Sequence, residues 1–310
     1  MKRFFAALLA SACLAVPAAH AGDLADNVAQ LTRGAEWKLV KSPRLDFDTY
    51  HPQGFARAGD FIFMSSVEIV ERTKKYETPK DGMDRDEGKG AGHLFKLDAD
   101  GKLVGQVKLG DGAIYHPGGI DFDGRWLWVP VAEYRPNSKS IMYRVDPETL
   151  EATEVFRFPD HIGGVVFDPE SSTLHAVSWG SRRFYTWKVT EDLTVPDAAL
   201  DPEKTRTLNP SHYIDYQDCG LLKAGQAVCT GITEYRPGSD GQLFRLGGID
   251  VIDLKAGRPL FQVPVQIWSE KGKSITGNPV LVEKTETGIR LTAAPEDNES
   301  KLYVYETELK

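Results

Sequence analysis

The sequence has few cysteines and no long apolar segment, and it lacks the motifs of several large enzyme classes. Only three of its 310 residues are cysteine, and no cysteine-based metal motif is present. No segment approaches the roughly 18 apolar residues of a membrane-spanning helix, so we expect no membrane span. A Walker loop, a Gly-x-Ser-x-Gly nucleophile elbow and a His-Glu-x-x-His helix are also absent. A Ser-His-Asp triad stays open, although no serine stands out as its nucleophile.

Basic residues are in deficit as well. The chain carries 45 acidic and 37 basic residues, which gives a formal net charge of −8 at pH 7. An acidic domain without a concentrated basic face repels phosphates, so we do not expect nucleic acid as a partner. The length suits one all-β domain of the larger kind. We expect a monomer.

Residues 1–21 have the pattern of a secretory signal peptide. Basic residues precede an apolar run over residues 4–16, and a small-x-small cleavage site follows at residues 19–21. We therefore expect a periplasmic or secreted protein. Residues 22–35 would form an N-terminal arm, and residues 36–310 a single domain.

Two of the cysteines flank a predicted turn at residues 223–225. Cys219 and Cys229 are equidistant from the centre of this turn, so they face each other across a hairpin. An exported chain permits a disulfide between them. The alternative is a pair of small buried apolar residues.

One pattern of two short strands joined by a tight turn, followed by two further strands, recurs along the chain. The copies open near residues 51, 116, 161, 212 and 278. Four-stranded units at a period near 50 residues are typical of a β-propeller. The last copy is one strand short, while residues 36–45 form a strand without a neighbour. The sequence therefore predicts an all-β, five-bladed propeller whose N-terminal strand closes the last blade. A β-sandwich fits the alternation but not the recurrence.

The best copy of the pattern is His-Pro-x-Gly-Ile-x-Phe-Asp-Gly-x-x-Leu-Trp-Val at residues 116–129. It resembles the inner-strand repeat of propellers of the NHL, gluconolactonase and strictosidine-synthase kind. The chain beyond the signal peptide also resembles an uncharacterised family of bacterial and fungal propeller-like proteins, known only as a domain of unknown function. These resemblances imply the fold and no chemistry.

Four of the seven histidines, namely His51, His116, His161 and His212, open the innermost strands of their repeats. Innermost strands line the channel of a propeller, so these imidazoles should form a ring around its mouth. Neutral imidazoles bind divalent transition metals, and Fe, Mn, Zn and Cu are all compatible. The constellation is similar to the four-histidine iron site of carotenoid-cleaving oxygenases and to the histidine-bound metals of the amidating lyase and of propeller pectate-type lyases. That similarity implies a metal and no particular activity.

Glutamates end the returning strands at the same rim, at Glu68, Glu133, Glu234 and Glu296. Carboxylates behind metal-binding imidazoles accept the second ring N–H and fix the tautomer. We expect Glu68 and Glu296 to support histidines in this way, and Glu133 or Glu234 to orient a histidine or act as general base. The alternative is that the histidines tie adjacent blades together and the glutamates are solvated strand ends.

Arginines follow the glutamates. Glu-Tyr-Arg-Pro at residues 133–136 recurs at residues 234–237, and these copies supply Arg135 and Arg236, while Arg182 follows the third returning strand. Such arginines can hold a carboxylate or phosphate, which favours a small anionic substrate. The alternative is that each arginine pairs with its neighbours to fix the loop.

Together these patterns predict a divalent-metal-dependent enzyme, a lyase, hydrolase or oxygenase. A non-catalytic binding propeller with a structural histidine ring is the alternative. The charged insertion at residues 71–90 leaves the same rim and is predicted to be a lid or a flexible loop.

Overall fold

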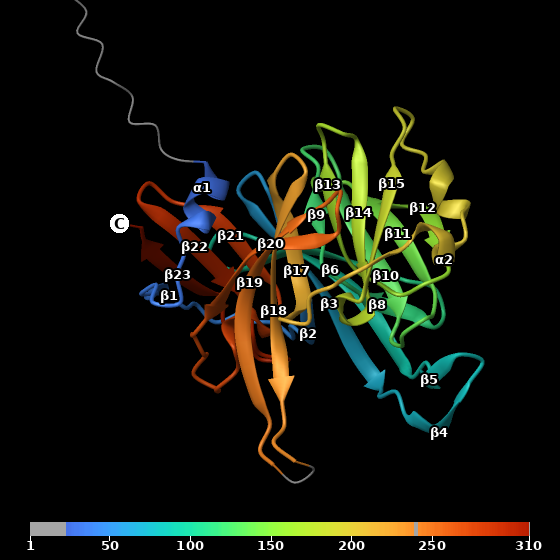
Figure 1. Cartoon of the computed structure of the whole chain (residues 1–310), viewed down its shortest axis with the longest axis horizontal. Helices are drawn as coiled ribbons and strands as arrows, with labels where there is room; N and C mark the ends of the chain where they lie inside the picture. Colours follow the sequence, from blue (N-terminus) through green and yellow to red (C-terminus); the bar gives the residue numbers. More distant parts are fainter. Residues whose placement is uncertain (1–22, 239–240, 310) are drawn as a thin grey trace, which may run out of the picture.

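The computed structural model describes residues 23–238 and 241–309. These residues form five antiparallel sheets of four main strands, arranged as the blades of a β-propeller (Figure 1). The predicted fold class and blade number are therefore confirmed. The predicted signal peptide lies outside the described residues. None of the described helices is long and apolar enough to cross a membrane.

The blades follow the order of the chain. Blade 1 consists of β2 (His51–Ala58), β3 (Phe61–Glu71), β6 (Lys89–Leu97) and β7 (Leu103–Leu109). Blade 2 consists of β8 (Ile114–Pro117) with β9 (Asp121–Phe122), then β10 (Leu127–Glu133), β11 (Ser140–Val145) and β12 (Ala152–Phe158). Blade 3 consists of β13 (Ile162–Asp168), β14 (Thr173–Ser178), β15 (Arg183–Lys188) and β16 (Thr207–Leu208). Blade 4 consists of β17 (Asp215–Lys223), β18 (Gln226–Tyr235), β19 (Phe244–Asp253) and β20 (Arg258–Val265).

Blade 5 is assembled from both ends of the domain. It contains β21 (Val280–Lys284), β22 (Gly288–Ala293) and β23 (Tyr303–Glu308), and its outer strand is β1 (Lys38–Lys41). β1 runs antiparallel to β23, with Leu39 opposite Tyr305. Closure by the N-terminal strand is thus confirmed. The helix α1 (Leu24–Ala29) precedes β1 and buries Val28 between blades 4 and 5.

Short helical segments occupy connections between strands and between blades. They are η1 (Trp179–Ser181), η2 (Pro196–Ala199), α2 (Pro202–Thr205) and η3 (Ile275–Gly277).

Apolar side chains fill the spaces between blades. All seven residues of β10 are buried, because neighbouring sheets cover both faces of this strand. The described residues contain five apolar clusters, one at each contact between neighbouring blades. Trp128 of blade 2 and Phe167 of blade 3, for example, stack with ring centres 5.8 Å apart. The blades are therefore held together mainly by apolar packing.

Glycines allow the inner strands to approach one another. A Cβ atom on Gly118 would lie 2.3 Å from the carbonyl oxygen of Gly163, and one on Gly54 would lie 2.6 Å from the Cα atom of Gly119. Gly119 and Gly164 form a parallel bridge between blades 2 and 3. The glycines that recur in the repeat thus serve close backbone packing.

The predicted disulfide is present. Cys219 and Cys229 face each other across the β17–β18 hairpin and are bonded. The hairpin turns at Ala224 and Gly225, and Gly225 has a φ of 71°, a conformation that glycine adopts without strain.

The insertion at residues 71–90 forms a two-stranded hairpin of β4 (Lys75–Lys80) and β5 (Met83–Arg85). In Figure 1 it projects from the lower edge of the molecule, as does the long β18–β19 hairpin. β3 and β18 also end at this edge (Figure 1). It is the rim at which the predicted site residues lie.

Two carboxyl groups on inner strands connect the blades near the axis. Asp121 of blade 2 accepts the backbone N–H of Phe167 in blade 3 at 2.8 Å. Asp218 of blade 4 accepts the N–H of Phe55 in blade 1 at 2.7 Å. Burial raises the pKa of Asp121 to about 7 and that of Asp218 well above its usual range.

The Asp121 carboxyl should give stability a distinct pH dependence. Its raised pKa means that the folded chain keeps a proton which the unfolded chain releases near pH 4. Because folding and protonation are linked, the contribution of Asp121 to the free energy of unfolding falls by roughly 4 kcal/mol as pH rises from about 4 to 7. Burial lowers the pKa of His161 to about 4, so its contribution to stability has the opposite pH dependence. The quantity to measure is therefore the difference in stability between the variant and the wild type.

We expect Asp121→Asn to gain stability relative to the wild type as pH rises from 4 to 7.5, measured by urea unfolding at several pH values. Exposed Asp60→Asn is the matched control and should show no such trend. A constant difference between Asp121→Asn and the wild type would contradict the assignment.

Candidate functional site

The four predicted histidines line one cavity. His51, His116, His161 and His212 surround a space of about 590 Å³ at the rim where the inner strands begin. The rim glutamate that lines it is Glu234. A ring of imidazoles therefore exists as an arrangement in space.

Three of the histidines stand in a row. The ring centres of His51 and His116 are 6.5 Å apart, and those of His116 and His161 are 6.0 Å apart. Tyr134 stacks on His116 with ring centres 4.3 Å apart, and the Trp179 ring stands edge-on to His161 at 4.8 Å. These aromatic rings restrict the rotation of the imidazoles they touch.

His116 is the central member of the row. It is 6% exposed, and among the described residues neither of its buried ring nitrogens has a hydrogen-bond partner. Burial lowers the pKa of His116 well below its usual range, and the neighbouring His161 and His51 lower it further. The ring is therefore neutral at physiological pH, and one of its nitrogens carries an unused lone pair.

His51 and His161, the outer members of the row, each direct Nδ1 at an acceptor outside the row. The Nδ1–H group of His161 donates to the carbonyl oxygen of Glu133 at 2.8 Å. His51 Nδ1 lies 2.7 Å from the Asp297 carboxylate, which can only accept. In the neutral form of either ring the proton is therefore on Nδ1 and the lone pair on Nε2. Neither Nε2 has a hydrogen-bond partner among the described residues.

His212 has the opposite tautomer. Arg182 donates from Nη1 to His212 Nδ1 at 2.8 Å. A guanidinium group has no lone pair to offer, so Nδ1 must be the acceptor and the proton of the neutral ring lies on Nε2. His212 therefore offers a donor where the row of three offers acceptors.

Glu133 and Glu234 do not bond to the histidines through their carboxylates. Glu133 is buried and receives Arg135 Nε at 2.6 Å, while its carbonyl oxygen holds His161. Glu234 receives Arg245 Nε at 2.6 Å and lines the cavity. Of these two glutamates, only Glu234 has a carboxylate beside the space that a ligand would occupy.

The other two rim glutamates also lie away from the row. Glu68 pairs with His93 Nε2 at 3.3 Å and lines a neighbouring hollow of about 330 Å³ that shares His51 with the main cavity. Glu296 accepts the hydroxyl of Tyr303 at 3.0 Å. Its successor Asp297 is the carboxylate that holds His51.

The three predicted arginines are all engaged in hydrogen bonds. Arg135 spans Glu133 and, at 3.3 Å, Glu87 of the insertion. Arg236 is exposed and donates to a backbone carbonyl of its own loop at 3.3 Å. Arg182 holds His212. Each arginine thus contributes to fixing its loop, and Arg182 also acts on the cavity.

Sequence reasoning missed several residues at the cavity. Tyr134 and Trp179 form part of its wall, and Arg85 of the insertion lies over the Trp179 ring at 5.0 Å. Asp215 lines the cavity as well. The Glu-Tyr-Arg-Pro motif contains Tyr134, so the motif held a signal for one of them.

The histidines are not drawn together around a common point. Across residues 23–238 and 241–309, no group of three or more His, Cys, Asp or Glu side chains is close enough to hold a metal ion as it stands. The spacing of about 6 Å between ring centres in the row accounts for this.

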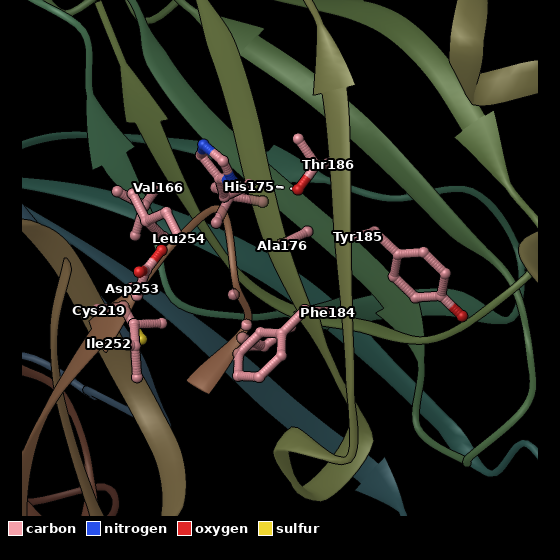
Figure 2. A pocket seen from close by; sticks show the side chains of 14 residues that line it. Val166, His175, Ala176, Phe184, Tyr185, Thr186, Cys219, Ile252, Asp253 and Leu254 are labelled. Carbon is pink, nitrogen blue, oxygen red and sulfur yellow. Dashed lines mark hydrogen bonds between the residues drawn. The ribbon is translucent and has the colours of Figure 1, made fainter. Parts of the chain in front are cut away.

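A separate hollow lies between blades 3 and 4 (Figure 2). Its volume is only about 20 Å³, room for one water molecule. Most of its lining side chains are apolar, and His175 is bonded to Thr186 at 3.1 Å (Figure 2). It is too small to be a substrate site.

A family model described as "Family of unknown function (DUF6454)" matches residues 6–310. The chain belongs to this family. The expected resemblance to an uncharacterised family is therefore confirmed. A search of curated proteins found no match.

Several solved structures share the arrangement of the chain at low identity. The luciferin-regenerating enzyme is 11% identical with a TM-score of 0.46, over 89% of this chain and 97% of that one. The periplasmic gluconolactonase of Pseudomonas aeruginosa is 12% identical with a TM-score of 0.39, over 83% and 88%. Hydrazine synthase of Kuenenia stuttgartiensis is 15% identical with a TM-score of 0.40; the match covers 81% of this chain and 57% of that one, little more than half its length. Likeness at this level says nothing about chemistry.

Proposed function

We propose that the cavity is the active site of an exported enzyme, which binds a divalent transition metal through His51, His116 and His161 and acts on a small anionic substrate. The observation that carries this proposal is His116. Both of its buried ring nitrogens lack a partner within the described part of the chain, which is costly, and a metal ion with a bound water or substrate would relieve that cost. The flanking rings support it, because each keeps a lone pair on Nε2.

The spacing of the row sets what binding requires. Imidazoles that share a metal at about 2.1 Å from each Nε2 have ring centres roughly 5 Å apart. The rings in the row are 6.0 and 6.5 Å apart, so metal binding must draw them inward by about 1 Å. His51 has the most freedom to move, since 28% of its side chain is exposed.

A metal in this position would polarise a substrate oxygen or activate water or dioxygen, as lyases, hydrolases and oxygenases all require. The chain supplies the rest of the site. Asp297 and the Glu133 carbonyl orient the outer imidazoles. The Glu234 carboxylate lines the cavity and would accept a proton as general base.

Export and a monomeric state belong to the same proposal. The Cys219–Cys229 disulfide supports an oxidising compartment outside the cytosol.

Elemental analysis by mass spectrometry tests the metal directly. The protein is purified from the periplasm without a polyhistidine tag or chelator. We expect about one transition metal per chain, and less than one tenth of that in His116→Ala and His161→Ala. His175→Gln is the matched control, because the half-buried His175 lies between blades 3 and 4, away from the cavity. A wild type that stays metal-free after incubation with Fe, Mn, Zn and Cu would overturn the metal proposal.

The wide spacing of the row favours one second candidate, a propeller that binds a small ligand without catalysis. Unmetallated imidazoles with free lone pairs would then accept hydrogen bonds from the ligand. A metal-free protein that still bound small anions would support this alternative.

A further inference from the structure

We propose that His212 is a neutral hydrogen-bond donor for a carboxylate or phosphate oxygen of the ligand, held in this role by Arg182. This inference deepens the proposed function, on which its link to a substrate rests. It separates His212 from the three histidines assigned to the metal.

Arg182 determines the tautomer of His212. Arg182 Nη1 donates to His212 Nδ1 at 2.8 Å. An imidazolium carries hydrogen on both nitrogens and could not accept this bond, so the ring is neutral. Its remaining hydrogen is on Nε2, which has no partner among the described residues.

Arg182 is itself fixed on several sides. Its Nε donates to the Gly180 carbonyl at 2.6 Å, and Nη1 also donates to the Ser211 carbonyl at 2.9 Å. Its Nη2 lies 3.5 Å from an Asp215 carboxylate oxygen. A guanidinium group with these partners cannot turn away without breaking several bonds. It therefore acts as a positioning residue for His212.

The loop that carries Arg182 is shaped for this position. Gly180 and Ser181 both have a φ of 57°, which a serine adopts rarely and at a cost. Ser181 is held there by accepting the backbone N–H of Tyr216 on its hydroxyl at 2.6 Å, and its carbonyl accepts Asn209 Nδ2 at 2.9 Å. The strained turn is thus over-determined by its neighbours, as is typical of functional loops.

The polarity of the cavity gives the ligand class. Neutral His51 and His161 offer lone pairs on Nε2, whereas His212 offers an N–H group backed by the positive charge of Arg182. Such a donor suits an oxyanion. A ligand with a carboxylate or phosphate oxygen toward His212 and a reacting group toward the row would satisfy both sides.

The experiment uses the mature chelator-treated protein labelled with ¹⁵N at histidine. Two-bond nitrogen–proton correlations identify the tautomer, and His212→Gln assigns the His212 signals. We expect His212 in the Nε2–H form, and a saturable shift of its ring signals on titration with sodium acetate or inorganic phosphate. The two titrations separate a carboxylate site from a phosphate site.

Three variants give the proposal its controls. Arg182→Met removes the donor to His212 Nδ1, so the ring should no longer be fixed in the Nε2–H form and anion binding should weaken at least tenfold. Arg182→Lys should retain part of the tautomer preference and part of the anion binding. Arg183→Met is the matched control, because Arg183 is the next residue, at the start of β15, but bonds to Asp160 at 3.1 Å. It should leave the His212 tautomer unchanged.

The outcomes distinguish this inference from the metal proposal. An Nδ1–H tautomer or the absence of any anion-dependent shift would overturn the donor role, and an unchanged tautomer in Arg182→Met would overturn the positioning role of Arg182. Loss of metal in His212→Gln would make His212 a ligand and overturn it as well, leaving the metal proposal standing. A metal-free wild type whose His212 responds to anions would sink the metal proposal and keep the donor.

Discussion

A chain that lacks residues 23–41 should fail to accumulate as folded protein. The deletion removes β1, the outer strand of blade 5, and exposes the edge of β23. It also removes Val28 and Leu31, which are 0% and 4% exposed in the cluster between blades 4 and 5. At about 1.5–3 kcal/mol for each buried side chain and about 1 kcal/mol for each lost strand hydrogen bond, the loss is roughly 5–8 kcal/mol. That is comparable with the whole net stability of a typical domain.

A shorter deletion separates the strand from the helix. Removal of residues 23–35 keeps β1 and should give a folded but less stable protein, as measured by thermal unfolding and by the soluble fraction after expression. A synthetic peptide of residues 34–45 should restore solubility to the longer deletion by adding a strand to β23. If the longer deletion unfolded within a few degrees of the shorter one, β1 would not be the closure on which the ring depends.

The closure and the ring of histidines could be predicted because both follow from the repeat. A count of strands leaves blade 5 one short, and the strand near Leu39 is the one left over. Equivalent positions in a closed ring must meet at one rim, so His116 and its counterparts share a cavity. Neither inference required any knowledge of side-chain geometry.

The partners of the histidines could not be predicted in the same way. In the structure His51 bonds to Asp297, one residue beyond the glutamate that the strand ends indicate. The shift arises because an irregular loop follows β22, in which Asn298 has a φ of 62°. The repeat placed Arg182 among the substrate-binding residues, yet the turn at Ser181 directs it onto His212. Loop conformations of this kind do not repeat from blade to blade, so a repeat-based analysis has no signal for them.

Contacts across the axis are the other class that the sequence hides. Nothing in the sequence marks Asp218 as different from other residues of its repeat, and its partner Phe55 is 163 residues away. From the sequence alone, such a carboxyl group is expected to be solvated, because the strands that bury it are not yet known. The effect of replacing it should nevertheless be one of the largest in the molecule.

We expect Asp218→Leu to lower the free energy of unfolding by about 2–6 kcal/mol. Asp218 is 3% exposed, and its carboxyl group accepts the backbone N–H groups of Phe55 at 2.7 Å and of Cys219 at 3.1 Å. Leucine fills a similar volume but accepts nothing, so two buried donors would lose their partner at about 1–3 kcal/mol each. The loss falls on the inner strand of blade 4 and its contact with blade 1.

Urea unfolding at pH 5 measures this loss, and Asp218→Asn is the control. Asparagine keeps one acceptor oxygen and matches the neutral acid that the raised pKa favours at this pH, so it should cost no more than about half as much. If the leucine and asparagine variants were equally stable, hydrogen bonding by Asp218 would contribute little, and apolar packing between the blades alone would hold the ring closed. A large loss in leucine alone would show that one carboxyl group near the axis holds blades 1 and 4 in register.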